Sequence, residues 1–135
     1  MKLIEVTNNV AQTVSAGDPL VLGNISRRVG LFTDYSAPGT ILTIRECGYY
    51  DIVFKVNAEG TAAAQVVQVT IYVDGVAIPE TLASHVATAV GDSETLNTNK
   101  IIRVFACSDA TISVVNTGVT DTVYNNIVLD VVKVV

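Results

Sequence analysis

The chain contains one histidine, His85 in the stretch LASHVATAV, and it is the first residue to consider for catalysis. A serine nucleophile needs a neighbouring base, and Ser84 directly precedes this histidine. The alternation of the stretch predicts a strand, and adjacent side chains on a strand point to opposite faces. The two side chains are therefore out of hydrogen-bonding reach. We interpret His85 as a surface or interface histidine.

Acidic residues are the remaining candidates for acid–base or metal chemistry, because paired carboxylates hydrolyse glycosidic bonds and oxygen clusters bind calcium. Nearly all of the candidates lie at or beside predicted turns, where aspartate is common for backbone reasons. Asp92 and Glu94 form one short cluster, which supplies too few oxygen ligands for calcium. We therefore expect no enzyme activity, no metal and no cofactor. The carboxylates considered are Asp51, Asp74, Asp92, Glu94, Asp109 and Asp121.

Composition argues against several classes of partner. The chain of 135 residues has a net charge of −5 and only eight Lys and Arg, so it lacks the basic surface that nucleic acid or an anionic membrane attracts. No apolar stretch approaches the ~18–20 residues of a membrane span. The first residues, MKLIEVTNNVAQ, carry no secretion signal. We expect synthesis in the cytoplasm of the producing cell, with neither nucleic acid nor membrane as a partner.

A hydrophobic period of two runs through almost the whole chain and defines the elements that would carry any site. Val, Ile and Thr dominate the alternating runs, and turn signals separate them about every ten residues. Asp74–Gly75, for example, supplies the positive φ angles of a tight hairpin turn. In YDIVFKVNA the inward set is Tyr50, Ile52, Phe54, Val56 and Ala58. We predict strands at residues 9–15, 19–23, 40–45, 49–58, 65–73, 81–90, 99–107, 110–117 and 122–134.

Many short strands without a helical stripe predict an all-β, antiparallel β-sandwich, and the length fits a single domain over residues 1–135. Half of the residues are hydrophobic and only 16% are charged, which is unusually apolar for such a chain. Part of the excess lies on the outward face of strand 49–58, where Tyr49 and Val53 alternate with polar residues. We expect another protein surface to cover this apolar face, because water solvates it poorly.

Four stretches in this order, GYYDIVFKV, VTIYVDGVAIPET, ATISVVNTG and NNIVLDVVKV, resemble the tumour necrosis factor-like jelly roll as found in small bacteriophage and prophage structural proteins. The opening TNNVAQTVSAGDPLVL is similar to the first strands of phage head-decoration and head-fibre proteins. The resemblance covers nearly the whole chain and consists of folding landmarks, with no catalytic signature. It implies a jelly-roll β-sandwich of two sheets with about 8–10 strands, and three protomers around a threefold axis.

The resemblance also implies which surface joins the protomers. Strands 49–58, 99–107 and 122–134 would belong to an inner sheet whose back face meets the other two protomers. Their outward faces are apolar, and burying apolar surface stabilises by about 25 cal/mol per Å². A register shift of one residue would exchange the two faces. The predicted trimer interface is Tyr49, Val53, Ile102, Val104, Tyr124, Val128 and Val132.

Cys47 and Cys107 are too few for a disulfide scaffold, and neither has a second ligand at metal-binding spacing. Two free thiols are one interpretation. If the implied inner sheet pairs 49–58 with 99–107 antiparallel, the two cysteines come close and a disulfide is the alternative. Both interpretations stay open.

The function expected from this resemblance is a non-enzymatic virion structural protein, a homotrimer that decorates or cements the phage head. Its partners would be itself and the major capsid protein, and it would reside on the capsid surface after synthesis in the host bacterial cytoplasm. Residues 1–12 are a candidate capsid-facing segment. The alternative is a trimeric receptor- or carbohydrate-binding tip of a phage fibre or bacterial surface, in which loops 33–39, 91–98 and 118–122 hold a host-surface glycan.

Overall fold

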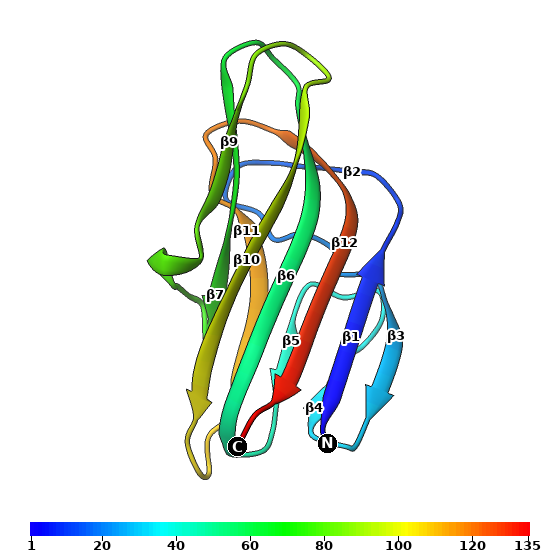
Figure 1. The fold of residues 1–135 in the computed structure, drawn as a ribbon, viewed down its shortest axis with the longest axis vertical. Coiled ribbons are helices and arrows are strands. Elements are labelled where there is room, and N and C mark those ends of the chain that lie inside the picture. Colours follow the sequence, from blue (N-terminus) through cyan, green and yellow to red (C-terminus); the bar gives the residue numbers. More distant parts are fainter.

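The computed structural model describes residues 1–135 as two antiparallel sheets packed face to face (Figure 1). The first sheet, called here the β6 sheet, has the order β10-β6-β12-β1-β3, and β2 also pairs with β12. Its strands are β1 (Leu3–Asn8), β2 (Gln12–Val14), β3 (Asn24–Val29), β6 (Gly48–Gly60), β10 (Ser93–Val104) and β12 (Thr122–Lys133).

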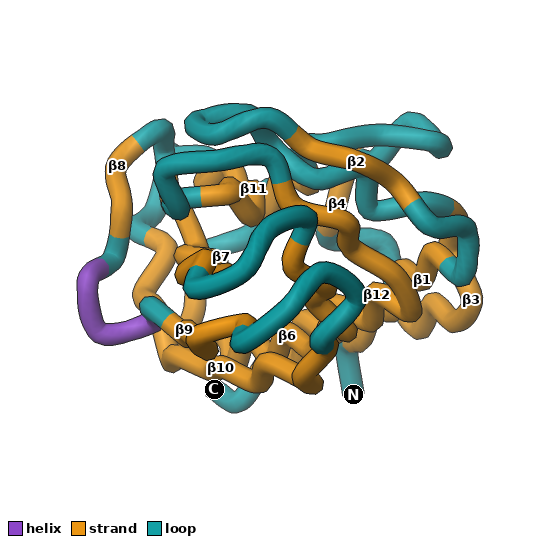
Figure 2. Tube along the Cα trace, turned by 90° about the horizontal axis from the view of Figure 1, so that it is seen from above, coloured by secondary structure: helices purple, strands orange, loops and turns teal.

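The second sheet, called here the β7 sheet, has the order β4-β5-β11-β7-β8, and β9 also pairs with β7. Figure 2 shows the two sheets as opposed layers, viewed from above. The all-β, antiparallel sandwich predicted from the sequence is confirmed. There are more strands than expected because several are very short. The strands of this sheet are β4 (Thr33–Asp34), β5 (Leu42–Ile44), β7 (Gln65–Val73), β8 (Val76–Ala77), β9 (Ala83–Ala87) and β11 (Ala110–Asn116).

The only helical element is the single 3₁₀ turn η1 (Pro79–Thr81). No helix of the structure has the length and apolar character that a membrane crossing requires.

The hydrophobic core lies between the sheets as one cluster of 26 buried residues. The inward set predicted for β6 is fully buried, as are Val67, Val69 and Ile71 of β7. Phe32 stacks on Tyr50 with ring centroids 5.6 Å apart. Alternation along β6 therefore identified its core face correctly.

The beginning of the chain differs from the prediction. Leu3–Asn8 forms β1, an internal strand between β12 and β3, whereas the sequence predicted the first strand at 9–15. Strand β3 was missed because its stretch NISRRV is mostly exposed and carries little alternation. Residues 1–12 thus contain an integral strand of the β6 sheet and do not form a separate arm.

Strand β12 contains a bulge that reverses its alternation. The register shifts between Asn125 and Val128, and Asn126 adopts a left-handed φ of 54°. An extra residue exchanges the faces of all side chains beyond it. Tyr124 therefore points into the core, where its hydroxyl donates to the Gln68 carbonyl over 2.7 Å. The prediction that Tyr124 shares the outer face with Val128 is wrong.

The face of β10 was also assigned incorrectly. Ile102 lies opposite Tyr50, and Val104 lies opposite Gly48. Residues directly opposite each other on paired strands share a face. Ile102 and Val104 are consequently only 8% and 3% exposed and belong to the core, so their assignment to the trimer interface is wrong. Their neighbour Ile101 takes the outward position.

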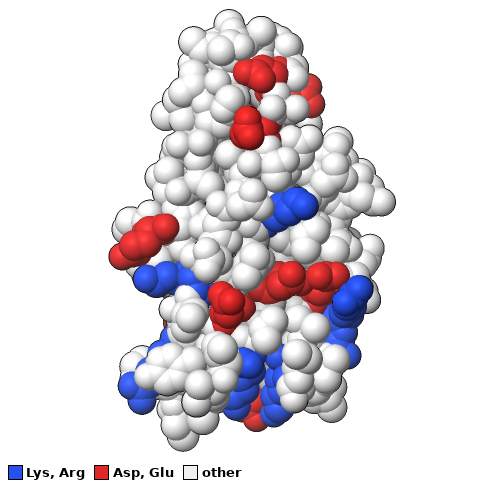
Figure 3. Space-filling model, in the orientation of Figure 1, with Lys and Arg blue, Asp and Glu red and all other residues white.

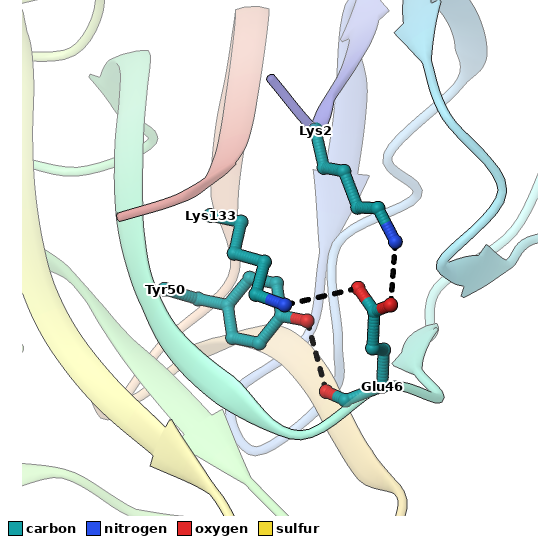
Figure 4. Close-up of polar contacts among 4 residues, drawn as sticks. All are labelled: Lys2, Glu46, Tyr50 and Lys133. Carbon is teal, nitrogen blue, oxygen red and sulfur yellow. Dashed lines mark hydrogen bonds and ion pairs between the residues drawn. The ribbon is translucent and has the colours of Figure 1, made fainter. Parts of the chain in front are cut away.

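The two ends of the chain meet at one end of the sandwich (Figure 1). There, Lys2 and Lys133 bind the two carboxylate oxygens of Glu46, and the Tyr50 hydroxyl donates to the Glu46 carbonyl over 2.8 Å (Figure 4). The hydrogen bond from Lys2, followed by that from Lys133, lowers the pKa of Glu46. This cluster joins the first strand, the last strand and the segment that leads into β6.

Candidate assembly surface

The outer face of the β6 sheet, turned to the viewer in Figures 1 and 3, arranges its side chains in rows across the strands. The pairing registers define three central rows. The first row is Ile101, Asp51, Val132, Leu3 and Val29. The second row is Asn99, Val53, Asp130, Glu5 and Arg27, and the third is Asn97, Lys55, Val128 and Thr7.

Large apolar side chains remain exposed on and beside this face. Tyr49 is 43% exposed, Val53 39%, Ile101 55% and Phe105 58%. The guanidinium of Arg103 lies over the rings of Tyr49 and Phe105, 5.7 and 4.5 Å from their centroids, in cation–π geometry.

Four of the seven predicted interface residues lie on this face, and their part in an interface stays a prediction. They are Tyr49, Val53, Val128 and Val132. Sequence reasoning missed Ile101 and Phe105, because the strand that carries Ile101 was predicted to begin six residues too late and with its faces exchanged.

The same face holds most of the unpartnered polar atoms of the protomer. Buried side-chain oxygens without a hydrogen-bond donor occur on four residues, and three of them, Asp51, Asn125 and Asp130, belong to this face. The fourth is Thr33. A buried acceptor left without a donor costs about 1–3 kcal/mol. Buried acceptors without a donor are thus concentrated on one sheet face.

Two carboxyl groups meet at the centre of this face. Glu5 of β1 lies directly opposite Asp130 of β12. Burial raises the pKa of Asp130 to about 6, and the hydrogen bond with Glu5 and the charge of Glu5 act in the same direction. The pKa of Glu5 is lowered by its hydrogen bond with Asp130 and by one from the Ser26 hydroxyl, which lies 2.6 Å from Glu5 Oε1. At mildly acidic pH the pair therefore holds one proton.

Sequence reasoning did not identify the Glu5–Asp130 pair. The only local signal is an acid at an outward position in each of the stretches LIEVT and VLDVV. Recognising the pair required knowing that the first strand lies beside the last one.

Charges of both signs surround the pair. Figure 3 shows an acidic band across the middle of this face, with lysine and arginine atoms at its margins. The registers assign the band to Glu5, Asp51 and Asp130. Positively charged side chains of the same face are those of Arg27, Lys55 and Arg103. A surface that carries both signs can be complementary to another copy of itself.

The histidine considered for catalysis lies on β9, the strand that pairs with β7. His85 Nε2 is 3.4 Å from Asp92 Oδ2, and its Nδ1 is 3.9 Å from Glu94 Oε2. Asp92 already accepts a hydrogen bond from the Thr88 amide over 2.9 Å, which closes the turn between β9 and β10 and is the main cause of its lowered pKa. Ser84 faces away from His85, as alternation predicts. No group of three or more His, Cys, Asp or Glu residues is arranged to hold a metal ion.

Both cysteines are exposed and free. Cys47 directly precedes β6, and Cys107 lies in the turn after β10 with a φ of 61°. Gly48 pairs with Val104, so the same register continued by one residue would place Cys47 opposite Phe105, about two positions short of Cys107. The structure therefore has the two free thiols and lacks the alternative disulfide.

The three segments expected to bind a glycan in the alternative function, 33–39, 91–98 and 118–122, differ in structure and position. Most of 91–98 belongs to strand β10. Residues 118–122 are joined to the β6–β7 connection, because Thr61 and Gln65 both donate to the Asp121 carbonyl. Residues 33–39 are fastened elsewhere, by a hydrogen bond from the Tyr35 hydroxyl to the Gly23 carbonyl.

No protein-family model matches the chain, and no curated protein sequence does. Solved structures match over its full length. The globular domain of zebrafish complement 1qA protein has a TM-score of 0.76 at 11% identity and covers 100% of this chain and 98% of its own. Eiger TNF from S. frugiperda has a TM-score of 0.74 at 9% identity, with coverages of 100% and 94%. Murine APRIL has a TM-score of 0.71 at 10% identity, with coverages of 98% and 98%.

These likenesses show the fold. The chain is a jelly-roll sandwich of the tumour necrosis factor and complement 1q type, as the sequence resemblance implied.

Proposed function

We propose that the chain is a non-enzymatic structural module that assembles into a homotrimer through the outer face of the β6 sheet. The observation that carries the proposal is the placement of three of the four donorless buried acceptors on a face that also exposes Tyr49, Val53 and Ile101. Water covers such a surface poorly, because the apolar side chains gain from burial and the acceptors need donors.

A second copy of the chain suits this face chemically. Each copy presents the donors Lys55 and Arg103 and the acceptors Asp51 and Asn125 on this face, so two copies can exchange hydrogen bonds. Stable interfaces bury about 800 Å² per partner. The number of three protomers follows from the tumour necrosis factor-like family that the sequence resembles.

The biological setting proposed for this trimer is a bacteriophage or prophage particle, where it decorates or cements the outside of the capsid. The resemblance of TNNVAQTVSAGDPLVL to head-decoration and head-fibre proteins supports this setting. The major capsid protein is then the second partner, and the virion surface is the location. The end of the sandwich that gathers both chain termini is the candidate capsid-facing surface (Figure 1).

A receptor- or carbohydrate-binding tip is the second candidate function. The hydrogen bonds from Thr61 and Gln65 to Asp121 favour it, because they join two loops into one unit far from the chain termini. In a trimer, three such units would lie around one axis and could bind a repeated surface glycan.

Light scattering on the purified chain tests the assembly, with a matched pair of variants. Val53 and Val66 are both 39% exposed, but they lie on the outer faces of β6 and β7 respectively. The wild type and Val66→Asp are expected at three times the protomer mass of 14.2 kDa, and Val53→Asp at the protomer mass. A wild type that stays monomeric at all concentrations, or two variants that behave alike, would overturn the proposal.

Purification of particles separates the two settings. A decoration protein co-purifies with heads at a copy number fixed by capsid symmetry. A binding tip retains cells or immobilised glycans when purified alone.

A further inference from the structure

We propose that the Glu5–Asp130 pair makes self-assembly of this protein pH-dependent, with tight assembly when the two carboxyls share a proton and weaker assembly when both are ionised. The inference rests on the proposed function, since it concerns the same sheet face. The inference goes beyond the proposed function because it assigns a proton switch to Glu5 and Asp130.

The position of the pair makes it sensitive to anything that covers the face. Glu5 and Asp130 occupy the central row, with Val53 beside Asp130 on β6. The rows on either side place Val132 and Val128 next to them. Asp130 Oδ1 is already buried without a donor in the single protomer. A second copy laid over this row would remove the remaining water from both carboxyls.

The charges facing the pair do not compensate both carboxylates. On β3, Arg27 lies opposite Glu5, and Ser26 donates to Glu5. On β6, the positions flanking Val53 on the same face are Asp51, which adds a like charge, and Lys55, whose exposed side chain lies opposite Val128.

The more distant strand β10 contributes no carboxylate to the three central rows, and Arg103 lies beyond them against Tyr49 and Phe105. One cation, Arg27, thus faces two carboxyls, and for Asp130 burial and the neighbouring Glu5 outweigh the opposing effect of Arg27 on its pKa.

The direction of the pH effect follows from proton linkage. Removing water from a carboxyl disfavours its charged form, so assembly raises the pKa of Asp130 above the value of about 6 that it has in the protomer. The assembled state then binds more protons than the free protomers between the two values. Assembly weakens as the pH rises through this window, by at most about tenfold per pH unit for each protomer.

Sedimentation velocity between pH 5 and pH 8.5 tests the switch on the full chain. The wild type is expected to lose affinity at least tenfold between pH 5.5 and pH 7.5. Asp130→Asn imitates the protonated state, so this variant should assemble tightly at every pH with a flat profile. Glu5→Gln removes the neighbouring charge and should move the transition to lower pH. Asp18→Asn, at an exposed position between β2 and β3, is the control and should follow the wild type.

Exchange of subunits between two labelled populations provides a second readout if dissociation is too weak to detect. The exchange rate should increase with pH in the wild type and stay constant in Asp130→Asn. A flat wild-type profile with a stable trimer, or a pH dependence that survives in Asp130→Asn, overturns this inference and leaves the proposed function intact. A wild type and Asp130→Asn that are monomeric at every pH overturn both.

Discussion

Ile102 of β10 lies directly opposite Tyr50 of β6, and both side chains are buried between the sheets. Ile102→Ala should therefore lower the free energy of unfolding by about 2–4 kcal/mol, as a large-to-small change in a core does. Ile101→Ala, one residue away on the outer face, should cost less than about 1 kcal/mol. Urea unfolding at low protein concentration measures both. A larger loss for Ile101→Ala would contradict the register.

The bulge in β12 depends on the backbone of Asn126, whose φ of 54° is unfavourable for branched side chains. Asn126→Val should destabilise the fold by about 1–2 kcal/mol, while Asn126→Gly should change stability by less than about 0.5 kcal/mol, because glycine adopts this conformation without strain. Thermal unfolding followed by circular dichroism compares the two variants. Equal losses would contradict a left-handed residue at this position.

Asn116 ties three segments together from a fully buried position. Its Nδ2 donates to the carbonyls of Val14 and Thr120 over 2.9 and 3.1 Å, and its Oδ1 accepts from the Gly118 amide over 2.9 Å. Asn116→Ala leaves buried backbone groups unpaired, and we expect a loss of about 2–4 kcal/mol in chemical denaturation. Asn9→Ala, at an exposed turn, is the control and should lose less than about 0.5 kcal/mol.

The cluster of Glu46 with Lys2 and Lys133 should contribute stability only while Glu46 is ionised. The pKa of Glu46 is lowered in the fold, so its contribution is complete above its ordinary value of 4.5 and disappears as the pH falls through the folded value. Glu46→Gln should melt below the wild type at pH 7, and the two melting temperatures should converge as the pH falls from 4.5 through the lowered pKa of Glu46. One molar salt should also narrow the difference. A gap that widens in acid would contradict this cluster.

Both cysteines should react as thiols in the native protein. Cys47 and Cys107 are exposed and free, so Ellman's reagent should titrate two thiols without denaturant or reductant. Cys47→Ser and Cys107→Ser should each leave one. A native chain that gives none, and two only after reduction, would restore the disulfide interpretation.

Several features followed from the sequence because they are local. Alternation alone assigned the inward residues of β6, since this strand shows its buried face as every second residue. The turn predicted at Asp74–Gly75 ends β7 correctly, although the short strand β8 that follows it was not predicted. The apolar excess on the outward face of β6, at Tyr49 and Val53, was also visible. The family resemblance added the jelly-roll arrangement of these strands.

Pairing between distant strands was decided only by the tertiary structure. In the sequence, strand β1 is a short apolar stretch followed by polar residues. In the structure it lies between β12 and β3 and places Glu5 opposite Asp130. The prediction placed Tyr124 and Ile102 on the wrong face for a related reason. The bulge in β12 and the register of β10 against β6 determine which side chains of these strands point outward. A sequence shows that a strand has two different faces, but the neighbouring strands determine which face is covered and which groups meet on the other.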